Sequence, residues 1–321
     1  MQITIIGMGQ IGCSIGLALQ GYQNDLTIVG YDKNLDRQKF AKSIGACVKT
    51  FINMHDAVEG ADLVILATPY TTLPTLFGQL KESIKQGCVI ISTAPNKKFT
   101  SALIKENFPE DTHFIGLTPS FNPQYIRILD PGDIIEKSDL FSNTTLGISA
   151  PAGTNETALK YASDLVRLLG AKVYYLDLLE ADGIERNSNL LPSLASFITL
   201  TATFGQPGWN DTRDTISQSY LNLSAAYGYE NPQDLARSIL DEKENALAIL
   251  DRLTSQANEL RRLIEQEDEK ELVASFEKTH KSKQYIFEGR KTGNWEVKDK
   301  PDSKPDKKTF LKELFFGSRE K

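Results

Sequence analysis

Cysteine and histidine are scarce in this chain of 321 residues, with three of each. Cys13, Cys47 and Cys88 are too few and too widely spaced for a disulfide framework or a zinc site. Their pattern favours small buried residues in a reducing compartment. The composition therefore argues against a disulfide-stapled scaffold and predicts no metal site.

The chain also lacks long apolar runs and a surplus of basic residues. No run reaches the roughly 18 apolar residues that a membrane-spanning helix needs, and we expect no transmembrane segment. The first predicted strand starts at residue 2, which leaves no room for a signal or transit peptide, so we expect a cytoplasmic protein. A net charge of −6 offers no basic face for nucleic acid, and we expect a small-molecule partner instead.

The first twelve residues carry the clearest pattern. A β-branched run over 2–6 ends in Gly7, Gly9 and Gly12, spaced as Gly-x-Gly-x-x-Gly, and an apolar helical pattern follows. Asp32 lies twenty residues beyond Gly12, at the end of a second strand-like run. Strand, glycines, helix and distal acid stand in the order of a dinucleotide-binding turn. The alternative is a tight α/β turn that binds nothing.

Each glycine has a physical role in such a turn. Gly7 allows the sharp turn, Gly9 lets a pyrophosphate approach the backbone, and Gly12 lets the helix pack closely on the strand. Gln10 and Ile11 open the helix, where unpaired N–H groups and the positive dipole end favour an anion. We therefore predict that this turn holds the cofactor pyrophosphate.

Asp32 indicates which dinucleotide is bound. Its carboxylate would accept hydrogen bonds from the adenosine ribose hydroxyls and repel a 2′-phosphate, which favours NAD over NADP. Lys33 and Arg37 stand close to Asp32 in sequence and weaken that preference.

Strand-like and helical runs alternate through the first half of the chain. Near-continuous apolar strands separated by helices imply an α/β fold with a Rossmann-type doubly wound, mostly parallel sheet. Thr68 and Pro69 end one of these strands at the carboxyl edge, where cofactor and substrate meet in such folds. The predicted strands are 2–6, 26–31, 63–67, 88–92, 113–117, 145–149 and 172–176, and the covering helices are 34–44, 71–85, 98–107 and 155–169.

The pattern becomes all-helical from about residue 178, over 178–204, 212–227 and 232–285, with a break expected near 266–268. We predict a dinucleotide-binding domain at 1–176, a helical substrate and dimerisation domain at 177–288, and a basic, flexible tail at 289–321. The helical domain favours a homodimer, although simple packing on the first domain would also explain it. In the tail we expect a disordered linker at 298–308 and a short amphipathic turn at 310–316.

From residue 2 to about 285 the chain resembles the prephenate/arogenate dehydrogenase family of tyrosine biosynthesis. The resemblance implies an NAD(P)-dependent oxidative decarboxylation, in which a hydride leaves the hydroxyl-bearing ring carbon for the nicotinamide and carbon dioxide departs. The first half alone would fit many other NAD-dependent dehydrogenases. The resemblance is carried by Gly30-Tyr31-Asp32, by 61–69 (Ala-Asp-Leu-Val-Ile-Leu-Ala-Thr-Pro), by Leu169-Gly170-Ala171, by Leu191-Pro192, and by Asn231-Pro232 with Lys243-Glu244-Asn245.

The chain departs from the family where the substrate would bind. A family histidine that contacts the reacting hydroxyl, in a His-Pro-Met-Phe-Gly-Pro-like motif, falls on Thr118. Threonine can hydrogen-bond a hydroxyl but cannot act as a general base at neutral pH. Two further family histidines fall on Leu190 and Ala181, and a substrate-binding arginine falls near Asp214, beside Arg213.

The remaining histidines do not replace the missing ones. His55, His113 and His280 lie away from the carboxyl ends of the predicted strands and are interpreted as structural or surface residues. Three hypotheses remain: a same-fold oxidoreductase for a different substrate, a cofactor-binding regulator or assembly protein without activity, and ordinary prephenate dehydrogenation by an unusual site.

Two loops at the carboxyl edge hold the candidate catalytic groups. One carries Ser92 and Lys97, and Lys97 aligns with the lysine of the family's Asp-Val-Gly-Ser-x-Lys stretch. A desolvated lysine could serve as the base. The alternative is a surface lysine at the start of a helix. The other loop supplies Thr118 and Asn122 for catalysis and Ser120 for substrate binding. Arg213 is a candidate for pairing with an acidic substrate. The alternative is that Arg213 forms a salt bridge with a neighbouring aspartate.

Overall fold

The computed structural model describes residues 1–125, 136–204, 206–209, 215–227 and 232–292. Arg213 and the predicted tail segments 298–308 and 310–316 lie outside the described residues. Contacts divide the chain into two compact units, Met1–Gln266 and Glu267–Lys321.

The first unit is built on an eight-stranded sheet with the order β3-β2-β1-β4-β5-β6-β7-β8. Neighbouring strands are parallel except β6 and β7, which pair antiparallel, with Thr118 opposite Gly147. The mostly parallel sheet is therefore confirmed. The strands are β1 (Gln2–Ile6), β2 (Thr27–Tyr31), β3 (Lys49–Thr50), β4 (Leu63–Leu66), β5 (Val89–Ser92), β6 (His113–Thr118), β7 (Thr145–Ser149) and β8 (Lys172–Leu176).

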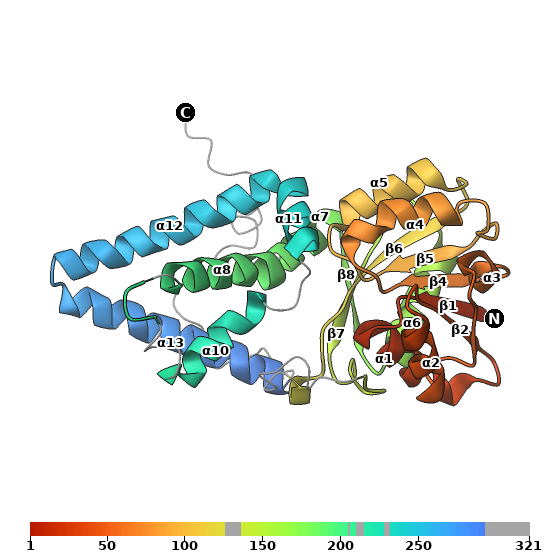
Figure 1. The fold of residues 1–321 in the computed structure, drawn as a ribbon, viewed down its shortest axis with the longest axis horizontal. Helices are drawn as coiled ribbons and strands as arrows, with labels where there is room; N and C mark the ends of the chain where they lie inside the picture. The colour runs from red at the N-terminus through yellow and green to blue at the C-terminus, as the bar shows by residue number, and fades with distance from the viewer. Residues whose placement is uncertain (126–135, 205, 210–214, 228–231, 293–321) are drawn as a thin grey trace. The chain divides into compact units, whose positions relative to one another are not determined.

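Helices cover both faces of the sheet, as the unbroken apolar strands require. Cys13, Ile15 and Ala162 pack in the core on one face, and Phe77 and Ile104 pack in the core on the other. In Figure 1, α4 and α5 lie on one side of the strands and α1, α2 and α6 on the other. These helices are α1 (Gln10–Ala18), α2 (Leu35–Ser43), α3 (Met54–Val58), α4 (Leu73–Leu80), α5 (Lys97–Asn107) and α6 (Glu156–Leu168), and short 3-10 turns occur at η1 (Gln20–Tyr22), η2 (Tyr70–Thr72) and η3 (Pro123–Tyr125).

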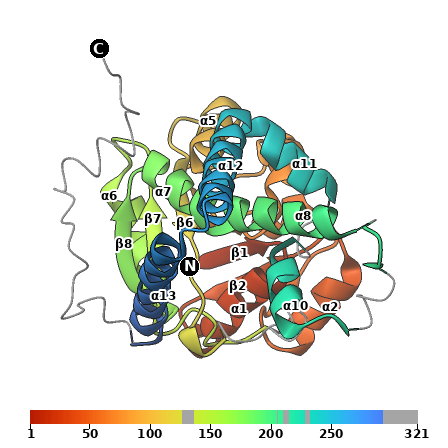
Figure 2. The same cartoon turned by 90° about the vertical axis from the view of Figure 1, so that its left-hand side faces the viewer.

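Beyond β8, the described residues of the first unit form helices joined by short connections, as predicted. A π-helical turn, η5 (Arg186–Leu190), joins α7 to α8, and Figure 2 shows α7, α8, α11 and α12 from the side of this region. Its small core packs Leu190 and Leu194 against Ala246 and Ile249. The helices are α7 (Leu178–Glu185), α8 (Leu191–Thr203), α10 (Gln218–Ser224), η7 (Ala225–Tyr227), α11 (Pro232–Asp241) and α12 (Lys243–Glu265).

The second unit begins with α13 (Glu269–Thr292). The break expected near 266–268 is confirmed, because α12 ends at Glu265 and Glu267 adopts a left-handed backbone with φ +52°. A second break, at Glu242 between α11 and α12, was not predicted. Within the described ranges, no helix has both the length and the apolar character needed to span a bilayer.

The helical region docks on the loop that follows β4. The Tyr70 hydroxyl donates to Asp241 Oδ2 on α11 at 3.1 Å, and the Thr71 hydroxyl donates to Asp234 on the same helix. Burial, followed by the Asp241 carboxylate, raises the pKa of Tyr70, so this phenol stays a donor. Two hydrogen bonds thus tie α11 to the carboxyl edge of the sheet.

Candidate cofactor and substrate site

The glycine turn after β1 is tightly enclosed at two of its three glycines. Gly7 has φ +95°, and a Cβ there would lie 2.4 Å from the Ala67 carbonyl oxygen. A Cβ on Gly12 would lie 1.9 Å from the Gly7 carbonyl oxygen. Neither position accepts a side chain, because backbone atoms would have to move.

Gly9 differs from its neighbours in the turn. A Cβ there would meet no atom within 4 Å, so the space beside it is open. Gly9 is the N-cap of α1, it makes no side-chain cap, and the first turn that contains Gln10 and Ile11 holds no acid. The first N–H groups of a helix lack intrahelical acceptors and carry its positive dipole end. The open space lies where a pyrophosphate would need it.

Asp32 lies beside this turn, just beyond β2. Its Oδ2 accepts the Met8 N–H at 2.8 Å and its Oδ1 accepts the Asn34 N–H at 2.9 Å. These two bonds fix the carboxylate on the glycine turn, and each oxygen keeps lone pairs for a ribose hydroxyl. The ribose-binding role of Asp32 stays a prediction.

Two threonine hydroxyls follow along the same edge of the sheet. Thr68, ahead of Pro69 and η2, comes just after β4, and Thr118 ends β6. Their Oγ1 atoms are buried and have no hydrogen-bond partner among the described residues. Thr112 and Tyr220 share that property, but Thr112 precedes β6 and Tyr220 lies on α10. An unpaired buried hydroxyl costs about 1–3 kcal/mol, so each of the two threonines at the edge keeps hydrogen-bonding capacity that no described residue uses.

Ser92 and Lys97 flank the loop after β5, between those two threonines. Ser92 is fully buried, and its Oγ accepts the Ala94 N–H at 3.2 Å, which stabilises the turn. Lys97 is also fully buried and is therefore not a surface lysine. Its Nζ donates to the Ala94 carbonyl and lies 3.8 Å from Glu185 Oε1.

Asp182 on α7 completes the surroundings of Lys97. Its Oδ1 accepts the Lys97 N–H at 2.5 Å and its Oδ2 accepts the Lys98 N–H at 3.2 Å, so it caps the start of α5 from 85 residues away. Burial lowers the pKa of Lys97, and Glu185 and Asp182 oppose that shift. Burial raises the pKa of Asp182, and the two N–H donors oppose that shift.

Sequence reasoning missed Asp182 and Glu185 as members of the site. The stretch Glu180-Ala181-Asp182 suggested only a lost histidine at its middle position. The available signal was a pair of acids, at positions 182 and 185, one turn apart on a helix after the sheet.

The loop after β6 contains Ser120 and Asn122. Both polar groups of the Asn122 side chain are used within the loop: Nδ2 donates to the Asp139 carbonyl at 3.1 Å, and Oδ1 accepts the Gln124 N–H at 3.2 Å. Its backbone N–H donates to the Leu140 carbonyl at 2.7 Å. Asn122 therefore positions the loop that carries the half-buried Ser120.

The positions of two missing histidines belong to the protein core. Ala181 is fully buried, and Leu190 packs in the apolar cluster of the helical region. The three histidines of the chain lie elsewhere: His55 pairs with Ser83, His113 starts β6, and His280 is exposed on α13. The described residues include no group of three or more metal-binding side chains.

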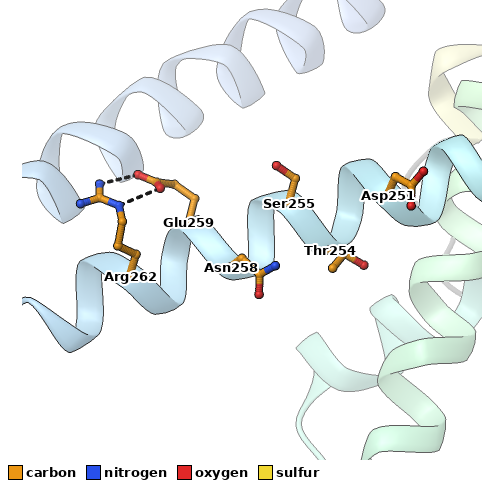
Figure 3. A pocket seen from close by; sticks show the side chains of 6 residues that line it. All are labelled: Asp251, Thr254, Ser255, Asn258, Glu259 and Arg262. Carbon is orange, nitrogen blue, oxygen red and sulfur yellow. Dashed lines mark hydrogen bonds and ion pairs between the residues drawn. The ribbon is translucent and has the colours of Figure 1, made fainter.

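A shallow hollow of about 520 Å³ lies along α12, away from this edge. Figure 3 shows its lining residues, all from one helix, with the Glu259–Arg262 ion pair at 2.6 Å. Six polar side chains on one solvated helix face do not form a binding site, and we assign it no function. The lining residues are Asp251, Thr254, Ser255, Asn258, Glu259 and Arg262.

The fold and the glycine turn define the class of protein as an NAD-binding, Rossmann-type oxidoreductase. The model for the nucleotide-binding domain of prephenate dehydrogenase matches residues 15–175, half of the chain. The chain belongs to the prephenate dehydrogenase family.

Individual relatives agree with this assignment. A cyclohexadienyl dehydrogenase from Zymomonas mobilis is 22% identical over 88% of this chain and 94% of its own length. The structure of prephenate dehydrogenase from A. aeolicus, in complex with hydroxyphenyl propionate and NAD+, is 19% identical, with a TM-score of 0.75 over 89% of this chain and 98% of that chain. Synechocystis arogenate dehydrogenase is 18% identical, with a TM-score of 0.69 over 89% and 100%. At these identities the two structures show the shared fold.

Proposed function

We propose that this protein is an NAD-dependent dehydrogenase acting on a small acidic cyclohexadienyl compound, in a reaction that transfers a hydride to the nicotinamide and releases carbon dioxide. The observation that carries the proposal is the row of groups along one sheet edge. Asp32, the open space at Gly9 and the unpartnered Thr68 and Thr118 hydroxyls follow one another from β2 to β6. The family and the named relatives supply the reaction class.

Thr118 would hold the hydroxyl that is oxidised, and Thr68 with Pro69 would border the cofactor. A threonine cannot act as a base at neutral pH, so Thr118 would orient the hydroxyl. The overall reaction releases no net proton, because the electron pair of the broken bond to carbon dioxide completes the aromatic ring and the oxygen keeps its hydrogen as a phenol. We assign Lys97, Ser92 and Asn122 to positioning, because each is hydrogen-bonded within the protein. Substrate binding by Ser120 and Arg213 remains a proposal.

A second candidate is an NAD-binding protein that does not turn over prephenate or arogenate. Alanine and leucine fill the core at two positions where the family resemblance leads one to expect histidine, Ala181 and Leu190. That repacking favours either a different substrate or a regulatory role.

Titration followed by an assay separates these candidates. Calorimetry with NAD and NADP tests cofactor binding, and formation of NADH with prephenate or arogenate tests turnover. The dehydrogenase proposal predicts NAD binding and NADH formation. The second candidate predicts binding alone.

Removing the Asp32 carboxylate should weaken NAD binding. In Asp32→Ala the ribose hydroxyls lose a charged acceptor, and we expect the NAD affinity to fall about tenfold, as for loss of a hydrogen bond to a charged group. Asp36→Ala is the matched control, since this exposed acid on α2 pairs with the exposed Lys39 and should leave affinity unchanged. Equal NAD affinity in Asp32→Ala and wild type, measured by calorimetry, would refute the ribose role.

Removing the Thr118 hydroxyl should lower activity without lowering stability. Thr118→Val keeps the shape and removes an unpaired buried oxygen, so the free energy of unfolding should hold or rise by about 1 kcal/mol. Turnover should fall roughly 10- to 100-fold, the worth of a hydrogen bond to the reacting hydroxyl. Thr118→Ser keeps the hydroxyl and should remain active. A fully active Thr118→Val enzyme would exclude Thr118 from the reaction.

We also propose the assembly and location of the protein. The helical region exposes large apolar side chains, among them Phe197, Ile198, Leu221 and Leu223, and a homodimer through this region would cover them. A monomer by light scattering at working concentration would contradict that dimer.

Free, buried cysteines suit a reducing cytoplasm. The division at residues 176 and 288, with a flexible tail, remains a prediction.

A further inference from the structure

We propose that Glu136 determines the choice between NAD and NADP by neutralising Arg37, the cation on α2 that a 2′-phosphate would otherwise engage. The inference rests on the proposed dinucleotide site. Asp32 already favours NAD over NADP, and Glu136, from a distant part of the chain, would strengthen that preference.

Arg37 stands where a 2′-phosphate receptor would be expected. It lies in the first turn of α2, whose N-cap Asn34 is two residues beyond Asp32. Its backbone N–H donates to Asn34 Oδ1 at 3.4 Å, which fixes the start of this helix next to the ribose acid. A guanidinium at this place is the usual partner of a 2′-phosphate in Rossmann folds.

Glu136 holds that guanidinium from 99 residues away. Arg37 Nη1 lies 3.1 Å from Glu136 Oε1. The Glu136 side chain is only 12% exposed, whereas the Arg37 side chain is 51% exposed. The acid is therefore the fixed partner, and the arginine reaches toward it.

The residue after Glu136 is anchored on the helix of the dinucleotide turn. The Lys137 N–H donates at 3.0 Å to Ser14 Oγ, a buried hydroxyl on α1. Burial first, and then the Glu136 carboxylate, raise the pKa of Cys13, also on α1, to about 12, while Arg37 opposes the shift. Glu136 and Arg37 thus both act at the same stretch of α1, beside the proposed cofactor.

The charges near the ribose favour a cofactor without a 2′-phosphate. Asp32 and Glu136 carry two negative charges against the single positive charge of Arg37. Lys39, the next cation on α2, pairs with Asp36 at 3.1 Å. Lys33, exposed beside Asp32, adds one positive charge. A 2′-phosphate would meet the Asp32 carboxylate and a guanidinium already paired with Glu136, whereas a ribose hydroxyl would meet the acceptor that it needs.

Calorimetric titration of four full-length proteins with NAD and with NADP tests this inference. The proteins are wild type, Glu136→Gln, Arg37→Ala with Glu136→Gln, and Glu106→Gln, in which the substituted acid is exposed on α5 in the other helix layer. We expect Glu136→Gln to bind NADP roughly tenfold more tightly than wild type, with NAD affinity within about twofold. The gain should disappear in the double variant and shrink as salt rises, because a freed surface cation is screened.

The outcomes distinguish failure of the proposed cofactor site from failure of the role of Glu136. If wild type binds neither dinucleotide, the proposed cofactor site fails and this inference fails with it. If wild type binds NAD but Glu136→Gln binds NADP no better than wild type and Glu106→Gln, the site stands and the role of Glu136 is refuted. A gain that persists in the double variant would also refute it, since Arg37 would then not be the receptor.

Discussion

Alanine at Gly9 should leave the protein folded and prevent it from binding NAD. The added Cβ meets no atom within 4 Å, and the φ of −83° suits any residue, so the loss of folding free energy should stay within about 1 kcal/mol. The same methyl group would occupy the space that the pyrophosphate needs against the backbone. We expect the NAD affinity to fall about 100-fold or more, which corresponds to about 2.8 kcal/mol.

Alanine at Gly12, unlike alanine at Gly9, should destabilise the folded protein. Its Cβ would lie 1.9 Å from the Gly7 carbonyl oxygen, so α1 must shift away from β1. Overpacking of this kind costs about 1–3 kcal/mol, and the displaced helix should bind NAD poorly as well. Denaturant unfolding and calorimetry on both variants measure the two effects. If Gly9→Ala binds NAD as wild type does, the pyrophosphate does not lie at this turn.

Replacing Lys97 should strongly reduce the stability of the protein. Lys97→Met removes the cation from a fully buried position and leaves Asp182 and Glu185 without it. Breaking a buried ion pair by removing one partner costs about 3–5 kcal/mol. Lys98→Met is the matched control, because its exposed side chain should change stability by less than about 0.5 kcal/mol.

The deficit of Lys97→Met should depend on pH in a defined direction. Lys97 lowers the pKa of Asp182, so its loss lets burial raise that pKa further above 3.8. An acid whose folded pKa is raised binds more protons folded than unfolded, so its contribution to stability falls as pH rises through that window. The deficit should therefore be smallest near pH 4 and grow toward pH 7. Urea unfolding across this range measures it, and a deficit that does not vary with pH would show that Asp182 is not coupled to Lys97.

The parts of the fold that depend on local pattern could be predicted from the sequence. The strand over 2–6, the glycine turn and Asp32 are encoded within 32 residues, and β1 spans Gln2–Ile6 as expected. The two-residue β3 is too short to produce a pattern of alternating side chains. The reversed direction of β7 also leaves no local trace, because a buried strand has the same composition in either direction.

The parts of the site that depend on distant contacts could not be predicted. Lys97 was singled out, but its burial follows from Asp182 and Glu185, which approach it only when α7 packs on α5. The Arg37–Glu136 pair joins residues 99 positions apart, and nothing near either residue indicates the other. A single sequence contains these charges without showing which of them meet.

Formation of NADH is the most direct test of the proposed dehydrogenase. The purified protein, with NAD shown by calorimetry to be bound, is mixed with prephenate and separately with arogenate, and absorbance of the reduced nicotinamide is followed. We predict NADH formation that requires both protein and substrate, with carbon dioxide released in equal amount and with slower turnover in Thr118→Val. Saturating NAD with no NADH from either acid would contradict the account and leave a cofactor-binding protein with another substrate or none.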